Sequence, residues 1–439
     1  MEIVRRRVNF IRSLLKRQID IKIFVLFSMF CIFPFLVIPN DFGSYCFPRY
    51  VMLVFLSLLS LITIIKEKEV KLSLFFLPLA LYLLCTLISS ITAYNTLTAW
   101  MGLFGVQAVP VAGQENTFTV VSTTRFTGFV TILCCVILYL TAYKAKRTEK
   151  LINAMIFCAA LVGFISLLQY FGIDIITRKI LMEGTVPYST MGNPNFLATY
   201  TALILPAAIY QYIKEKRKLW LLCTALIYTG MLLSFTRGVW LSFGISIVIM
   251  SIYYIRKKSF IKSFGLILLI LTIVTVVLLP IHGGFLYQRA LSIGGDISAG
   301  LEFEDSAGSG RMYIWKETMK LLPDHWVLGV GPDNLIYEGI SLNSSEPIDK
   351  AHNIYLETAV TMGIPALLFY LAFLSFFLLR RWKNDKDFMF FSMISTYLMQ
   401  GFFNIDVIMV LPLFWIVLGL YQAHLEEDKV FIQTGTYGD

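Results

Sequence analysis

The sequence predicts an all-α integral membrane protein with about twelve transmembrane helices and one large extracytoplasmic loop between spans 9 and 10. Hydrophobic residues make up 57% of the chain and charged residues only 15%, which excludes an ordinary soluble protein. Apolar runs of span length recur along the whole chain. The formal net charge of +9 is distributed over the short loops between these runs, so it does not indicate a nucleic-acid partner.

The N-terminal residues 1–20 combine six basic residues with an apolar line formed by Val4, Val8, Ile11 and Leu15. This spacing is typical of an amphipathic helix on the cytoplasmic lipid surface. A simple cationic anchor explains the same residues equally well. No small-residue cleavage site follows the next apolar run, so we expect that run to be an uncleaved first helix.

Twelve apolar runs are long enough to cross the hydrocarbon core as helices, which satisfy their own backbone hydrogen bonds. The predicted spans are 21–39, 49–65, 72–92, 126–143, 151–172, 193–213, 219–235, 239–255, 262–280, 353–379, 388–404 and 407–423. They divide the chain into a first bundle over 21–280, the large loop over 281–351, a second bundle over 352–423 and a tail over 424–439.

The orientation follows from the Lys and Arg residues. Of the 37 in the chain, 27 lie in the N-terminal segment, in alternate short loops and in the tail, which leaves 10 for the opposite side. Because cytoplasmic loops carry the excess of Lys and Arg, we expect both termini to be cytoplasmic. The large loop 281–351 is acidic and would then face outward.

Residues 97–111 could change this count of spans. They are apolar but only 15 long, with two glycines and a proline, so we expect an interfacial or re-entrant segment. None of the seven cysteines lies in the large loop, and no disulfide framework or zinc spacing follows from them.

Two arginines on the predicted outer side are candidate anion ligands. Arg237 lies in a short turn between two apolar runs, where it would either snorkel to lipid headgroups or clamp a phosphate with its planar fork. Arg311 opens an amphipathic segment that Ser309 is placed to cap. A basic residue opposes the helix dipole there, which favours an anionic ligand over a surface role.

His352 is the candidate general base. A lone histidine at a membrane boundary is most often structural, but its ordinary pKa near 6.5 suits proton transfer at neutral pH. His325 is the competing candidate. We prefer His352 because it precedes a helix start, where packing can hold it rigidly.

Two further motifs lie in the predicted outer loops. The GVGP sequence at 329–332 lacks the lysine and hydroxyl of a phosphate-binding loop and predicts a turn. In GNPNF at 192–196, Pro194 suits a first helical turn. We expect Asn193 and Asn195 to line the same outer mouth as the arginines, and Asn353 to join them there.

Four segments together resemble the O-antigen ligase and polymerase superfamily of bacterial membrane proteins. These segments are GNPNF at 192–196, TRG with Trp240 at 236–240, SGRMYIW through LGVGPDN at 309–334, and AHNIYLETAVTMGIP at 351–365. The resemblance covers about residues 185–380. It implies a metal-independent glycosyltransferase in the cytoplasmic membrane that needs no cofactor. Such an enzyme moves a glycan from an undecaprenyl-pyrophosphate carrier to a glycan, lipid or protein acceptor.

Carried over by motif, the resemblance implies that Arg237 and Arg311 hold the donor pyrophosphate and that His352 activates the acceptor. The superfamily contains ligases, polymerases and protein O-glycosylases. A transporter or flippase of the same lipid is the main alternative, but it would place ionisable residues near the midplane and often shows repeat symmetry. The predicted spans show neither. A membrane sensor or scaffold leaves the outer arginines and histidine unexplained.

Overall fold

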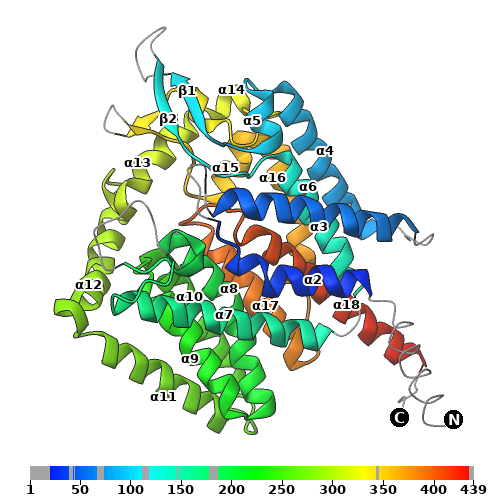
Figure 1. The fold of residues 1–439 in the computed structure, drawn as a ribbon, viewed down its shortest axis with the longest axis vertical. Helices are drawn as coiled ribbons and strands as arrows, with labels where there is room; N and C mark the ends of the chain where they lie inside the picture. The colour runs from blue at the N-terminus through cyan, green and yellow to red at the C-terminus, as the bar shows by residue number, and fades with distance from the viewer. Residues whose placement is uncertain are drawn as a thin grey trace, which may run out of the picture.

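The computed structural model describes residues 20–38, 43, 45–66, 74–110, 118–145, 148–176, 186–342 and 346–434, and it is mostly helical (Figure 1). The amphipathic helix expected over residues 1–20 lies outside the described residues, apart from Asp20. That residue begins the first described helix, because its carboxylate accepts a hydrogen bond from the backbone N–H of Lys22 at 3.1 Å.

Each predicted span contains helix. In chain order the corresponding long helices are α2 (Ile21–Cys31), α3 (Cys46–Lys66), α4 (Leu77–Thr92), α6 (Phe129–Tyr143), α7 (Thr148–Tyr170), α8 (Pro194–Glu215), α9 (Lys218–Leu233), α10 (Arg237–Ile255), α11 (Ile261–Leu278), α16 (Ile364–Leu378), α17 (Asp385–Gln400) and α18 (Leu411–Thr434). Among the described residues, α3, α7, α8, α10 and α11 are long and apolar enough to cross a membrane. The class of helical membrane protein is therefore supported, and the count of twelve spans stays a prediction.

The tenth predicted span, 353–379, is not one continuous helix. Its first part forms α15 (Ile354–Met362), and Gly363 separates α15 from α16. Gly363 has a φ of +92°, and a Cβ atom there would lie 2.1 Å from the carbonyl oxygen of Val327. The backbone N–H of Ile364 donates to the carbonyl of Trp326 at 2.7 Å. The large loop thus packs into the break, which the apolar pattern of the sequence does not reveal.

The large loop is itself built from regular elements. It contains α12 (Ile281–Leu301), α13 (Ala307–Met319), α14 (Leu322–His325), the 3-10 turn η4 (Leu335–Glu338) and the two-residue strands β3 (Ser341–Leu342) and β4 (Glu346–Pro347). Figure 1 shows α12 and α13 along one edge of the molecule, outside α10. This edge forms one wall of the cavity described below.

Residues 97–111 do not form a spanning helix. They contribute to the short helix α5 (Thr96–Met101) and to strand β1 (Val106–Pro110), which pairs antiparallel with β2 (Phe118–Ser122). Both strands carry β-branched residues, as strands commonly do. Together with the β3–β4 pair, this antiparallel strand pair is a departure from the all-α prediction. Strand β1 contacts η4 of the large loop, and Figure 1 shows β1 and β2 at the same end of the molecule as α14.

The core is centred on α8. Within the most apolar part of this helix, 94% of the residues are buried inside the protein, and α7, α9 and α17 pack around it. The helices α7 and α9 approach closely at Gly163, where a Cβ atom would lie 2.2 Å from the carbonyl oxygen of Leu226. A helix surrounded by protein on all sides can hold its N-terminal turn, and hence the GNPNF segment, in a fixed place.

A buried arginine ties this segment to the N-terminal helices. Arg49 is fully buried, and its guanidinium donates to the backbone carbonyls of Phe33 at 3.0 Å, Pro34 at 2.8 Å, Tyr45 at 2.7 Å and Thr190 at 3.0 Å. Thr190 belongs to the 3-10 turn η3 (Ser189–Met191), directly before GNPNF. The charge is therefore hydrogen-bonded on all sides and acts as a structural clamp.

Candidate active site

A cavity of about 660 Å³ lies where the predicted outer motifs meet. Its wall is formed by the first residues of α8 and α10, one face of α12, the start of α13, His352 and Phe403. These segments are separated by up to about 200 positions in the sequence, and only the fold brings them together. The cavity contains three arginines, one aspartate and one histidine among its lining residues: Arg237, Arg289, Arg311, Asp296 and His352.

Arg237 begins α10 directly after a backbone turn in which Phe235 has a φ of +52°. Its guanidinium donates to Ser292 Oγ at 2.8 Å and to Ser309 Oγ at 2.7 Å, and it forms an ion pair with Asp296 at 2.5 Å. A snorkelling arginine would extend toward the lipid headgroups. This arginine instead points to residues of α12 and α13 and is only 14% exposed.

Arg311 also lines the cavity, from the first regular helical turn of α13. Among the described residues its guanidinium donates one hydrogen bond, from Nη1 to the carbonyl of Gly308 at 2.7 Å, and its Nε atom is buried without a partner. Burial lowers the pKa of Arg311, and the charges of Arg237 and Arg289 lower it further. An arginine that is partly desolvated, under-bonded and repelled by other cations favours an anionic ligand.

The helix around Arg311 differs from the prediction in one respect. Gly308, Ser309 and Gly310 have positive φ angles, so the regular part of α13 begins only after them. No capping hydrogen bond from Ser309 is found among the described residues, and its hydroxyl accepts a hydrogen bond from Arg237 instead. The serine therefore links the two arginine-bearing segments.

Arg289 is a third arginine that the sequence reasoning missed. It lies on α12, and its Nε atom donates to the carbonyl of Phe235 at 3.3 Å. Burial lowers its pKa, and the neighbouring charge of Arg237 lowers it further. The available signal was the spacing of Arg289 and Asp296, two turns apart on one helix face. That spacing is informative only if residues 281–301 are known to be helical.

His352 immediately precedes α15 and has a φ of +51°, an uncommon conformation for a residue other than glycine. Its Nδ1 atom is buried and has no hydrogen-bond partner among the described residues. Burial lowers the pKa of His352 to about 4, and the charge of Arg311 contributes to this shift. The imidazole is therefore neutral at pH 7 and retains a free lone pair.

The backbone around His352 is anchored on both sides. Arg125 pairs with Asp349 at 2.7 Å. The backbone N–H of Ala351 donates to Glu357 at 2.7 Å. The Asn353 side chain caps α15 by accepting from the N–H groups of Tyr355 and Leu356 at 3.0 and 3.1 Å. These contacts hold the histidine in its strained conformation, as strained residues at functional sites require.

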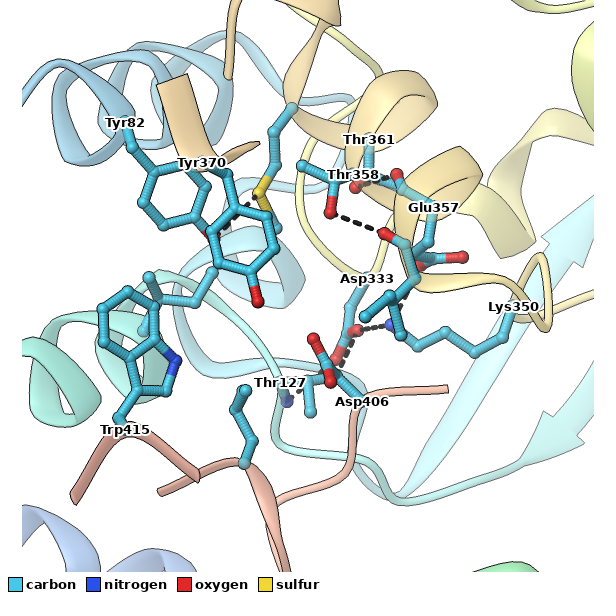
Figure 2. A pocket seen from close by; sticks show the side chains of 14 residues that line it. Tyr82, Thr127, Asp333, Lys350, Glu357, Thr358, Thr361, Tyr370, Asp406 and Trp415 are labelled. Carbon is cyan, nitrogen blue, oxygen red and sulfur yellow. Dashed lines mark hydrogen bonds and ion pairs between the residues drawn. The ribbon is translucent and has the colours of Figure 1, made fainter. Parts of the chain in front are cut away.

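An ionic cluster around Lys350 provides a further anchor for this segment (Figure 2). Lys350 is buried and bonds to Asp333 and to Glu357, the latter at 3.0 Å. Asp333 also accepts from Thr127 Oγ1 at 2.6 Å and from the N–H of Leu103 at 2.9 Å. Although burial alone would lower the pKa of Lys350, the two carboxylates raise it above its ordinary value. Lys350 is thus a structural cation.

Residues 219–371 match the family model described as O-antigen ligase. This region is therefore similar to the O-antigen ligase family. It runs from the start of α9 into α16 and includes Arg237, Arg289, Arg311 and His352. The predicted resemblance is thereby confirmed. No curated protein and no solved structure is significantly similar to the chain.

Within the O-antigen ligase region, the other predicted residues occupy distinct places. His325 approaches Glu338 at 3.7 Å and does not line the cavity. The GVGP segment is a turn, as predicted, and it packs against α15 through hydrogen bonds from Val330 to Val360 and from Gly331 to Thr361.

The predicted asparagines divide into two groups. Asn193 and Asn195, which precede the O-antigen ligase region, line the cavity. The Asn193 side chain caps α8, and Asn195 Oδ1 accepts from Thr236 Oγ1 at 3.1 Å. Asn353 caps α15 and is not among the lining residues. Substrate binding by these side chains stays a prediction.

Proposed function

We propose that this protein transfers a glycan from an undecaprenyl-pyrophosphate carrier to an acceptor hydroxyl on the outer face of the cytoplasmic membrane. The supporting observation is the convergence of three guanidinium groups and a neutral histidine on one cavity in the O-antigen ligase region. Among the described residues that line the cavity, Asp296 is the one carboxylate, so with the three arginines these residues carry a net charge of plus two. A pyrophosphate diester carries about two negative charges at neutral pH, so the charges match.

The donor phosphates would replace the existing partners of the arginines. Arg237 is held by a carboxylate, Asp296, and by two serine hydroxyls. A phosphate oxygen is an equally good acceptor for the guanidinium fork. Arg289 and Arg311 each donate one hydrogen bond within the part of the chain that the structure describes, so they have donors left for the same ligand.

In the proposed reaction, the acceptor oxygen attacks the anomeric carbon of the donor sugar while the bond from that carbon to the pyrophosphate oxygen breaks. The electron pair of the broken bond goes to the pyrophosphate, whose growing charge the three arginines stabilise. His352 takes the proton of the acceptor hydroxyl and later releases it to water. The arginines fill the role that a metal ion plays in other glycosyl transfers, so we propose that the reaction is metal-independent.

The low pKa of His352 has a functional consequence. A base with a pKa of about 4 is weak at neutral pH. Binding of the dianionic donor would offset the charge of Arg311 and raise the pKa of His352 toward its ordinary value. The histidine would then become a competent base only when the donor is in place.

Transport of the lipid-linked glycan is the alternative function. The site residues favour transfer, because the arginines and the histidine gather at one cavity beside the outer loop rather than along a path through the bundle. A histidine base beside arginines that bind an anion serves bond cleavage. It has no evident use in moving an intact lipid.

The experiment that tests this function uses the purified protein in lipid nanodiscs with an undecaprenyl-pyrophosphate-linked glycan and a set of hydroxyl acceptors. We expect free undecaprenyl pyrophosphate and a glycosylated acceptor to appear together, with or without EDTA. Movement of the intact donor between leaflets of a liposome without bond cleavage would support transport instead. Loss of transfer in EDTA, restored by a divalent metal, would contradict the metal-independent mechanism.

A further inference from the structure

Trp315 is an aromatic residue of the cavity with no role in the chemistry above. It lies on α13 four residues after Arg311, and it lines the cavity together with Phe403. Residues four apart lie on the same face of a helix, about 5–6 Å from one another. That offset is close to the width of one pyranose ring. A sugar attached to a phosphate at Arg311 would therefore lie over Trp315.

Phe403 is the second ring of this aromatic pair, and it lies next to the segment that carries Arg237. Its ring centroid is 6.5 Å from that of Trp315, and the two rings are inclined by 32°. Gly238, the residue after Arg237, makes the approach of Phe403 possible, because a Cβ atom there would lie 2.6 Å from Phe403 Cβ. The aromatic pair thus lies between the two arginine-bearing segments that would hold the phosphates.

The indole ring has an unused polar group. The Nε1–H of Trp315 is buried and has no acceptor among the described residues. Buried N–H groups without an acceptor are uncommon in folded proteins and call for an explanation. An indole combines an apolar face with one hydrogen-bond donor at its edge, which suits a sugar ring, whose C–H face is apolar and whose rim carries hydroxyl acceptors. A small tilt of the ring on binding would give this N–H its acceptor.

The polyprenyl tail of the donor is the competing occupant of an apolar surface in this cavity. The wall formed by α10 and α12 suits a tail better, because Leu241, Phe285 and Ile297 line the cavity there and are more than a third exposed. α11, a candidate membrane span with 22% of its apolar window buried, leads directly into α12. Trp315 and Phe403 come from α13 and from the segment after α17.

We propose that Trp315 and Phe403 form the platform on which the first sugar of the donor stacks, an inference that rests on the proposed function. The platform would hold the anomeric carbon between the pyrophosphate at the arginines and the base at His352. It would also make recognition depend on the ring face of the first sugar, since stacking requires C–H groups directed to one side.

The test compares two ligands on purified protein: undecaprenyl pyrophosphate carrying the glycan and undecaprenyl pyrophosphate without a sugar. We expect Trp315→Leu to bind the glycan donor about tenfold more weakly and the sugar-free lipid as tightly as the parent. Trp315→Phe should retain most of the affinity, because it keeps a ring face. Trp326→Leu is the matched control, since Trp326 is exposed and does not line the cavity.

Three results separate the two proposals. An equal loss of affinity for both ligands in Trp315→Leu would show that the ring contacts the lipid or the phosphates, and it would overturn the platform. No loss of affinity for either ligand would also overturn it. If the parent and Arg237→Lys bind the sugar-free lipid equally tightly, the proposed function itself is overturned. If Trp315→Leu does not accumulate in the membrane, Phe403→Leu carries the same comparison, with an expected selective loss for the glycan donor.

Discussion

Two groups of charged side chains border the segment around His352, and they differ in how many of their polar atoms have hydrogen-bond partners. In the ionic cluster, Asp333 accepts from Lys350, Thr127 and the N–H of Leu103, and Lys350 bonds to two carboxylates. The cavity that borders this cluster is only about 40 Å³. The charges of the cluster are buried and paired, as stable proteins require.

In the large cavity, by contrast, the charged side chains are not all paired. Three arginines share one carboxylate, and buried atoms of Arg311 and His352 lack any partner among the described residues. Such a site is electrostatically incomplete without an anion. The difference separates charges that build the fold from charges that we propose to bind a ligand, although the two groups look alike in the sequence.

We expect the largest effect on stability from Lys350→Met in the ionic cluster. This change leaves Asp333 and Glu357 buried without their cation, and we expect it to lower the free energy of unfolding by about 3–5 kcal/mol. Thermal unfolding of the purified protein and its level in membranes are the measurements. Lys320→Met, at the exposed residue directly after α13, is the control. A stable Lys350→Met variant would show that the cluster does not anchor the loop.

His352→Ala should instead leave stability unchanged and remove activity. We expect the rate of transfer to fall by about 10²–10⁴, with binding of the lipid-linked donor retained, because the histidine does not contact the phosphates in the proposed scheme. Transfer is followed by consumption of the donor at matched expression. His325→Ala is the control and should be mild. An inactive His325 variant beside an active His352 variant would move the base to His325.

Arg237→Lys and Arg311→Lys test the phosphate clamp. Each should reduce the rate of transfer by about 10²–10³, because a lysine ammonium cannot reproduce the bidentate fork. The variants should unfold at the same temperature as the parent, since lysine keeps the positive charge at each position. Arg217→Lys, at an exposed position, is the control. Full activity in Arg237→Lys would reduce that arginine to a structural or headgroup contact.

Arg289→Lys should have a smaller effect than the two preceding variants. The arginine is only partly buried and its single hydrogen bond is long, so we expect about a tenfold rise in the KM for the donor. Steady-state kinetics with varied donor concentration measure it. An unchanged KM, together with unchanged salt dependence, would exclude Arg289 from the clamp.

The pH dependence of transfer tests whether donor binding changes the pKa of His352. His352 acts in its neutral form, so activity falls as the pH drops through the pKa of this residue. In the free enzyme burial and Arg311 hold that pKa at about 4, and donor binding would raise it toward the ordinary 6.5. We therefore expect the acid limb of kcat to lie at higher pH than that of kcat/KM. Coincident limbs would contradict the proposed coupling between the arginines and the base.

The sequence by itself determined the class of protein and most of the site. Apolar runs reveal helices because a bilayer requires each span to satisfy its own backbone, and every predicted span contains helix. Arg237, Arg311 and His352 could be selected because each is a polar residue in a short motif, and the structure places all three at one cavity.

The tertiary structure decided what depends on contacts between distant segments. Arg289 and Asp296 enter the site only because residues 281–301 form a helix along the cavity. The break at Gly363 depends on a carbonyl 36 positions earlier, at Val327. Lys350, next to the predicted base, carries no local sign that it is buried between two carboxylates. Local sequence patterns indicate whether a segment is buried in lipid or exposed to water. The partner of a buried charge, in contrast, is fixed only when the chain has folded.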